Sequence, residues 1–265
     1  MTAARPRWRL IGYVLTALLL YAVFLVVTMP ATWMGTALTR LSGGAAGLQR
    51  ATGSFWHGSG DLAVRTGAPQ ALQTHLSWSI QPYWLLAGRL QARLEASGDV
   101  DAHATIRLGY RSVDIRDCRG SFPAGTASAV YFPLTLASLT GRVQFSAERL
   151  AIDSGGAHGA LEIKWLDAGS RMGGMADLGD YRLMLTGQGA AISILADTQR
   201  SEVQLNAKGD WQIQGDGMLN VDGTLAPGSR EAALTPLLTL LNARRSGNAY
   251  TFSVRTPLPS PLPRW

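Results

Sequence analysis

The chain has 265 residues, of which 46% are apolar and 16% are charged. The charged fraction lies below the roughly 25% typical of soluble domains, and the 30 glycines favour tight strands and turns. The net charge is +6, but the basic residues form no stripe with interleaved aromatic side chains, which argues against nucleic-acid binding. The single cysteine, Cys118, excludes an intrachain disulfide, and no Cys/His spacing indicates a zinc site.

The N-terminal region predicts a membrane anchor. Residues 10–29 carry no charge, and a helix of that length spans about 30 Å, the thickness of the hydrocarbon core of a bilayer. Arginines precede the run and no basic residue follows before Arg40, so the positive-inside rule places residues 1–9 in the cytoplasm. A cleaved signal peptide is the alternative. Because its apolar core is ordinarily shorter, we favour an uncleaved, single-pass transmembrane helix.

The region after the anchor alternates between apolar and polar residues. From residue 90 to residue 110 every even position is apolar or small, which predicts two strands that turn at 97–99. The same alternation recurs over residues 203–225 with the odd positions apolar. Its phase slips at 110–113 and 148–150, where bulges or turns are expected. Shorter copies predict strands at 72–80, 143–147, 161–165, 181–185 and 250–254.

Helical patterns are scarce after residue 30. One short helix is predicted over residues 31–41, and a second over 231–243, interrupted by Pro236 and closed by the basic pair and Ser-Gly at 244–247. Residues 257–265 form a Pro-rich tail that we expect to be extended.

Two short helices cannot cover the apolar stripes of about ten strands. The sheet must therefore fold over on itself as a sandwich, a closed sheet or a U-shaped trough, or present its apolar face to a partner or to lipid. We predict a mainly β fold: a transmembrane helix followed by a curved, one-sided amphipathic antiparallel sheet, trough or sandwich-like, with one or two short helices. Residues 30–256 would form one periplasmic, β-rich domain.

No arrangement of residues predicts catalysis. The four histidines have no metal-ligand spacing, and no nucleophile elbow, phosphate-binding loop or zinc-protease motif is present. Asp99, Asp101 and His103 would share one strand face and could in principle hold a cation, but the same face continues into Thr105 and Arg107, which favours an ordinary solvated face. We therefore predict no enzyme activity, no cofactor and no metal.

Glycine and aromatic clusters follow one another in a fixed order, and each is most simply a turn beside a buried ring. They are a G-x-x-W-x-G turn, a W…P…LL-x-G segment, a tryptophan-ended strand, an LG-x-Y-R-L strand, a G-x-W and a G-x-x-x-P step before a leucine-rich helix. In this order, from Arg9 to Val254, they resemble the type II secretion system protein N family. The residues that carry the resemblance are Gly53, Trp56, Gly58, Trp78, Pro82, Leu85, Leu86, Gly88, Trp165, Leu178, Gly179, Tyr181, Arg182, Leu183, Gly209, Trp211, Gly223 and Pro227.

The resemblance implies an accessory, structural component of the machine that exports folded proteins across the outer membrane of Gram-negative bacteria. It implies a single-pass location in the inner membrane, with the C-terminal domain in the periplasm. The implied partners are other secretion proteins, namely the inner-membrane platform, the secretin or the pseudopilins, which could dock on apolar surface or by strand addition. The family has no established catalytic residues, so none is carried over to this chain.

A second function is left open by the sequence. An AsmA-like anchored periplasmic β-trough would bind or transfer lipid, and it would show the same alternation. An apolar concave row can hold an acyl chain as well as it can form a core. Bound lipid is therefore the alternative to a docked secretion protein.

Overall fold

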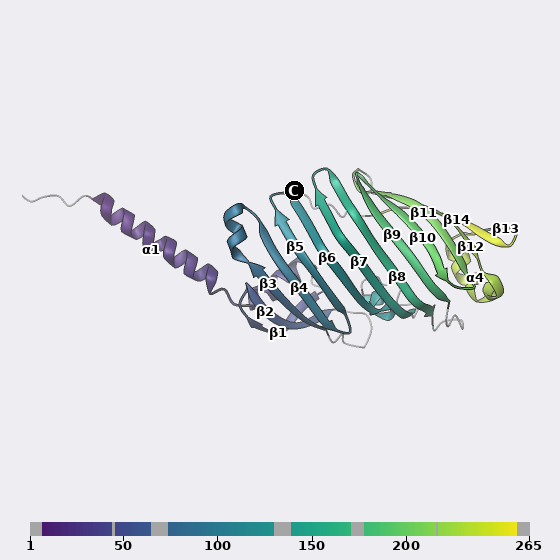
Figure 1. The fold of residues 1–265 in the computed structure, drawn as a ribbon, viewed down its shortest axis with the longest axis horizontal. Coiled ribbons are helices and arrows are strands. Elements are labelled where there is room, and N and C mark those ends of the chain that lie inside the picture. Colours follow the sequence, from purple (N-terminus) through teal and green to yellow (C-terminus); the bar gives the residue numbers. More distant parts are fainter. Residues whose placement is uncertain are drawn as a thin grey trace, which may run out of the picture.

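The computed structural model describes residues 7–43, 46–64, 74–129, 139–170, 178–215 and 217–258, without the side chains at 7–12, 19, 22, 41, 64, 85–87, 127–129, 233, 236, 237 and 240. Within these residues the chain forms one antiparallel sheet of 14 strands (Figure 1). Each strand up to β12 pairs with the next strand in the sequence, and β14 lies between β12 and the outermost strand, β13. The sheet is curved, and the described residues include no pairing between β1 and β13.

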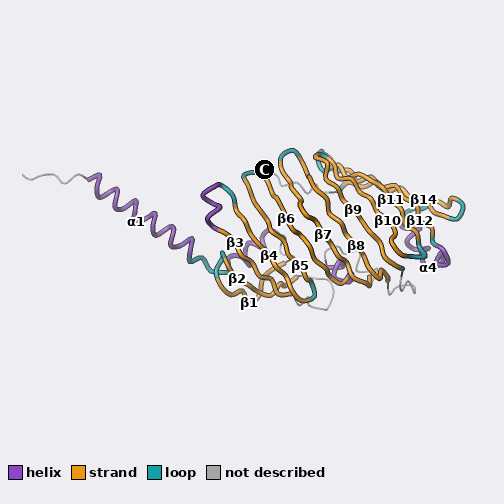
Figure 2. Tube along the Cα trace, viewed as in Figure 1, coloured by secondary structure: helices purple, strands orange, loops and turns teal. Residues whose placement is uncertain are grey.

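The strands are β1 (Ala46–Gly53), β2 (His57–Val64), β3 (Thr74–Gln81), β4 (Leu90–Gly98), β5 (Asp101–Gly109), β6 (Ser112–Pro123), β7 (Leu139–Asp153), β8 (Gly156–Ser170), β9 (Gly179–Gly189), β10 (Ala191–Arg200), β11 (Gln204–Gln212), β12 (Met218–Ala226), β13 (Arg244–Ser246) and β14 (Ala249–Pro257). The helices are α1 (Arg7–Val27), α2 (Thr32–Leu41), η1 (Pro82–Ala87), η2 (Ala124–Ala129), η4 (Gly228–Arg230) and α4 (Glu231–Leu240). Figure 2 shows that α1 projects from the β1 end of the sheet, whereas α4 lies at the β13 end.

Most of the predicted elements are confirmed. Helix α2 lies in the predicted range 31–41. The two long alternating segments form β4 with β5 and β11 with β12. The predicted slip at 148–150 corresponds to a register shift between β7 and β8. Strands β1, β2, β6, β10 and β13 were missed.

Two details at the C-terminal end were wrong. Helix α4 continues through Pro236 without interruption. A proline inside a helix removes one N–H hydrogen bond and clashes with the preceding turn. The packing of Leu234 and Leu238 in the core offsets that cost. The basic pair at 244–245 does not close the helix, because it begins strand β13, which forms a hairpin with β14. Residues 259–265 of the predicted tail lie outside the described residues.

Helix α1 covers most of the range predicted to cross the membrane. Its large apolar side chains from Tyr13 to Val27 that the structure describes are between 49% and 73% exposed. Within the described residues, no helix combines the length and the apolarity that crossing a membrane requires. The membrane anchor at 10–29 therefore stays a prediction.

One face of the sheet is apolar from β2 to β14, and we call it the apolar face. Cross-strand pairing joins its residues into a continuous row, the central ladder, in which every member is apolar or glycine. Most of these side chains are only half-buried. The central ladder runs through Gly60, Leu76, Ala96, Ala102, Gly120, Phe145, Ile163, Leu183, Ala196, Ala207, Gly223 and Phe252.

The opposite face is polar, because successive side chains of a strand point to opposite sides. Several of its ion pairs bridge neighbouring strands. Arg182 of β9 and Asp197 of β10 form a two-pronged pair at 3.0 and 2.7 Å, and Asp114 of β6 lies 3.1 Å from Arg149 of β7. The hydrogen bonds from Arg182 lower the pKa of Asp197 below its ordinary value. Such pairs hold the register that keeps all the apolar side chains on one face.

Burial of large apolar side chains is concentrated at the two ends of the apolar face, whereas the buried residues of the central strands β7 and β8 are small, namely Ala147, Ala157, Ala168 and Ser170. One core cluster joins Ala31, Trp56, Trp78 and Ile80 beside α2 and β1–β4. The other joins Val203, Leu225, Leu234 and Leu238, where α4 packs on the last strands. Between these ends the apolar face is left half-covered by the described residues.

Candidate functional site

The first cluster of predicted residues forms the junction between α1 and the sheet. A helix leaves its last carbonyl groups without partners in the helix. Here the indole Nε1 of Trp56 donates to the Val26 carbonyl at 2.8 Å, and the Phe55 N–H donates to the Met29 carbonyl at 2.8 Å. The Ala31 N–H reaches the Gly53 carbonyl at 3.3 Å. The G-x-x-W-x-G turn therefore binds the end of α1, and we call this region the anchor junction.

Trp78 of β3 packs against the anchor junction and is hydrogen-bonded to it. Its indole Nε1 donates to the Phe55 carbonyl at 3.0 Å, and it is 3% exposed, whereas Trp56 is 8% exposed. The rings of Phe55 and Trp56 pack edge to face with centroids 5.3 Å apart. Two buried tryptophans whose N–H groups are hydrogen-bonded thus hold the end of the helix in place.

Two glycines of the same turn are required by their surroundings. Gly53 has a φ of +92°, which favours glycine. A Cβ on Gly58 would lie 2.6 Å from both the Thr52 carbonyl oxygen and Cζ2 of Trp78. The absent side chain at 58 is therefore what lets the Trp78 ring lie against the neighbouring strand.

The second cluster of predicted residues lies around β8 and β9, which are central in the order of the sheet. The Tyr181 hydroxyl lies 3.1 Å from the Leu178 carbonyl and 3.2 Å from the Ser201 hydroxyl, which itself donates to that carbonyl. Burial raises the pKa of Tyr181. The indole of Trp165 donates to the Thr140 carbonyl at 3.0 Å, and its ring centroid lies 6.3 Å from that of Tyr181. Gly179 has a φ of +109° at the start of β9.

Beside this cluster the apolar face is hollowed into a pocket of about 400 Å³, which we call the apolar pocket. This volume lies in the range of small-ligand sites. Apolar side chains from β7 to β12 and from α4 meet here. Arg182 is the one charged residue among the described lining, and its guanidinium pairs with Asp197 on the polar face. The lining comprises Ala124, Leu139, Val143, Ile163, Trp165, Leu178, Tyr181, Arg182, Leu183, Ala196, Val203, Leu205, Leu225 and Leu234.

Glycines face aromatic rings across the strands at three places on the apolar face. Gly58 pairs with Trp78, Gly120 with Phe145, and Gly223 with Phe252. In each pair the ring occupies the space where a glycine Cβ would stand. This arrangement covers the glycine backbone with apolar surface and helps to pin the register.

The remaining predicted residues do not join either cluster. Pro82 begins η1, Leu86 lies within η1 without a described side chain, and Gly88 turns the chain back toward β4 with a φ of +66°. Trp211 lies on the apolar face, and its Nε1 is buried without a hydrogen-bond partner in the described part of the chain. Pro227 is buried at the start of η4.

The structure gathers no metal site within the residues that it describes. No group of three His, Cys, Asp or Glu side chains there could hold an ion. Asp101 instead accepts a hydrogen bond from the Gly98 N–H at 3.2 Å. Cys118 is a free thiol on the apolar face opposite Ala147, and burial raises its pKa.

Comparison with known families identifies the family of the chain. The family described as type II secretion system (T2SS), protein N, matches residues 45–253. The chain belongs to this family. The resemblance drawn from the glycine and aromatic clusters is thereby confirmed, and the match reaches from the start of β1 into β14, so the protein N sequence pattern includes the apolar face. No curated protein and no solved structure matches the chain.

In this member of the protein N family, three features of the site were not predicted from the sequence. The contact of Trp56 with Val26 joins residues 30 positions apart, so no local pattern reports it. The bond between Tyr181 and Ser201 and the apolar pocket likewise depend on how distant strands pair. One signal was available for the junction: Trp56 follows the predicted anchor closely, and a buried indole needs an acceptor.

Gly58→Ala should weaken the anchor junction, because its Cβ would collide with backbone as well as with Trp78. We expect the free energy of unfolding to fall by about 3 kcal/mol. Gly35→Ala in α2 is the matched control: its Cβ meets Leu48 at an ordinary 3.5 Å, and alanine favours the helix by up to about 1 kcal/mol. Urea titration of the full chain in detergent, followed by tryptophan fluorescence, measures both. Equal midpoints for the two variants would contradict the assignment of Gly58.

Proposed function

We propose that this protein is an inner-membrane-anchored accessory component of the type II secretion machinery. Its N-terminus would lie in the cytoplasm and its sheet in the periplasm, and it would contribute to export of folded proteins across the outer membrane. The single observation that carries the proposal is the protein N match over residues 45–253, which spans almost the whole sheet.

Helix α1 supports the proposed anchor. All of its side chains from Tyr13 to Leu18 are exposed, and all but Thr16 are apolar or aromatic, so the helix presents apolar surface on every side rather than on one stripe. Such a helix needs an apolar environment. The arginines before residue 10 and the absence of basic residues from there to Arg40 orient it with the N-terminus in the cytoplasm.

The anchor junction supports a domain held close to the membrane. Trp56 donates to the Val26 carbonyl in the last turn of α1, and Phe55 donates to the Met29 carbonyl just after the helix, so the short segment between helix and sheet is tied down. A rigid connection of this kind fixes which part of the sheet faces the bilayer. It suits a component that positions other proteins, and we propose no catalytic role for it.

Secretion assays test the proposed function. Deleting the gene should reduce the amount of secreted protein in the medium, and the full chain should restore it. A variant that lacks residues 10–29 and is exported by a cleavable signal peptide should fail to restore it, because the sheet is no longer held at the membrane.

Co-purification provides the second readout. The full chain should co-purify with the inner-membrane platform in mild detergent, and the variant without the anchor should not. Normal secretion after the deletion, together with recovery of the intact chain from the cytosol, would contradict the proposed function.

The apolar pocket favours a second candidate function, the binding of a lipid acyl chain. Its described side chains are apolar apart from the Tyr181 hydroxyl, since the Arg182 guanidinium pairs with Asp197 on the polar face, and the adjoining central ladder continues the same surface across neighbouring strands. An acyl chain laid along this surface would replace water against apolar side chains. In that function the trough would bind or transfer lipid beside the membrane.

Ala196→Phe should test the lipid hypothesis, because Ala196 lines the apolar pocket and a larger ring would fill it. Native mass spectrometry of the full chain should show bound phospholipid on the unchanged protein and a roughly tenfold lower occupancy on the variant. Ser193→Phe, on the same strand but on the exposed polar face, should leave occupancy unchanged. Absence of lipid from the unchanged protein, or equal phospholipid occupancy of the two variants, would contradict this second function.

A further inference from the structure

The two edges of the sheet are built differently. Strand β1 forms one edge, and its register against β2 shifts between Gln49 and Thr52. Arg50 within this shift has a φ of +49°. Helix α2 also packs beside this strand, with Gly35 against Leu48. A bulged and flanked edge of this kind resists pairing with another strand.

The edge formed by β14 lacks such protection. Strand β14 pairs with β12 through eight consecutive positions, from Tyr250 opposite Leu225 to Pro257 opposite Met218, without a register shift. Strand β13 covers only residues 249–251 of its outer side. From residue 252 to residue 257 the described chain places no strand against this side, and we call this segment the open edge.

The hairpin fixes which backbone groups the open edge offers. Its two-residue turn, Gly247 and Asn248, puts Ala249 in a hydrogen-bonded pair with Ser246, and bonding alternates along an antiparallel strand. Ser253 and Arg255 therefore direct their N–H and carbonyl groups outward. Phe252, Val254 and Thr256 are half-buried on the apolar face, whereas the side chains of Ser253 and Arg255 are exposed on the polar face.

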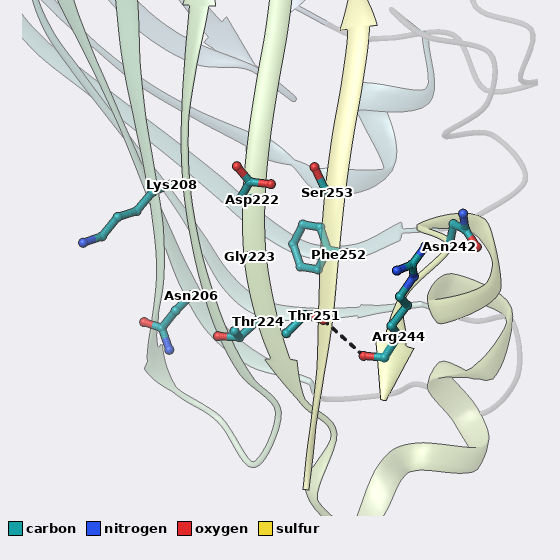
Figure 3. Close-up of a pocket in the computed structure, with 10 residues that line it drawn as sticks. All are labelled: Asn206, Lys208, Asp222, Gly223, Thr224, Asn242, Arg244, Thr251, Phe252 and Ser253. Carbon is teal, nitrogen blue, oxygen red and sulfur yellow. Dashed lines mark hydrogen bonds between the residues drawn. The ribbon is translucent and has the colours of Figure 1, made fainter. Parts of the chain in front are cut away.

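The polar face beside the open edge contains a hollow of about 770 Å³ (Figure 3). Lys208, Asp222 and Arg244 bring charge to it, and Ser253 lies on its β14 side. The hydroxyl of Thr251 donates to the Arg244 carbonyl at 3.3 Å, where β13 meets β14. Within the described residues no ion pair is formed by Lys208, Arg244 or Arg255. The hollow therefore carries more positive than negative charge, with Lys208 and Arg244 against Asp222.

A second copy of the chain fits the open edge poorly. Two antiparallel registers of two open edges bring the outward backbone groups into phase. With Ser253 opposite Pro257, Arg255 lies directly opposite Arg255, and like charges at that position are destabilising. With Ser253 opposite Arg255, the arginine faces a neutral hydroxyl and gains no carboxylate partner. Pro257 has no N–H to donate. The same positive charge favours a strand that carries carboxylates on its polar side.

We propose that the open edge accepts an extended strand from a partner protein, with apolar side chains on the apolar face and acidic side chains opposite Arg255 and beside Arg244. Main-chain hydrogen bonds to Ser253 and Arg255 supply the pairing, and the alternating side chains supply the selectivity. The added strand lengthens the apolar face by one row beyond Phe252 and Val254. This inference deepens the proposed function and rests on it only for the class of partner, another secretion protein.

Peptide binding to the full chain in nanodiscs tests the proposal. The probe is a fluorescein-labelled ten-residue peptide that alternates valine with glutamate, and its counterpart alternates valine with lysine. Fluorescence anisotropy should show the glutamate peptide binding about tenfold more tightly than the lysine peptide. A glutamate peptide methylated at the backbone nitrogens of its glutamates should lose this binding, because those N–H groups face Ser253 and Arg255 and can no longer donate to them.

Charge reversal separates the open edge from general attraction. Arg255→Glu should reverse the preference toward the lysine peptide, whereas Arg93→Glu, exposed on distant β4, should leave it unchanged. Equal binding of both peptides, undiminished binding of the methylated peptide, or an unchanged preference in Arg255→Glu would overturn the proposal. So would a concentration-dependent dimer that excludes the peptide. Because the assay contains no secretion machinery, normal peptide binding with a failed secretion assay would count against the proposed function alone.

Discussion

The structure depends on one constraint, which is that all the strands from β2 to β14 place their apolar side on the same face. Cross-strand pairing makes the central ladder continuous, so water is disfavoured along the whole width of the sheet and not at isolated spots. Two short helices shield only its ends, where the core clusters lie. The half-covered middle of this face is consistent with either a protein or a lipid as its natural cover.

Glycine and aromatic residues make this sheet possible. A broad sheet of half-buried strands has few side chains large enough to fix its register from one side. The pairs Gly58–Trp78, Gly120–Phe145 and Gly223–Phe252 place a ring over bare backbone at three separate points across it. Two of these pairs contain residues that carry the protein N resemblance, namely Gly58 with Trp78, and Gly223.

The sequence predicted the strands in which alternation was clean and missed those in which it was masked. Strand β2 places Gly58 and Gly60 on the apolar face, so the first half of its apolar row has no side chain to detect. In β6, Asp117 has a φ of +50° and interrupts the period of two. Strand β10 carries Leu195 on its polar face, which blurs the alternation, and β13 has only three residues. Burial of Trp56 and Trp78 could be predicted from residue type, but their partners could not, because these depend on distant segments meeting.

Cysteine accessibility across the central ladder tests the half-covered apolar face most directly. In a Cys118→Ala background of the purified, delipidated full chain, Ala102→Cys occupies the middle of the ladder, Ala207→Cys its buried end, and His103→Cys the exposed polar face. With a water-soluble maleimide, Ala102→Cys should react within about tenfold of His103→Cys, and Ala207→Cys about a hundredfold more slowly, since it waits on local opening. Protection of Ala102→Cys equal to that of Ala207→Cys would show that the chain covers its own apolar face, and would contradict the account.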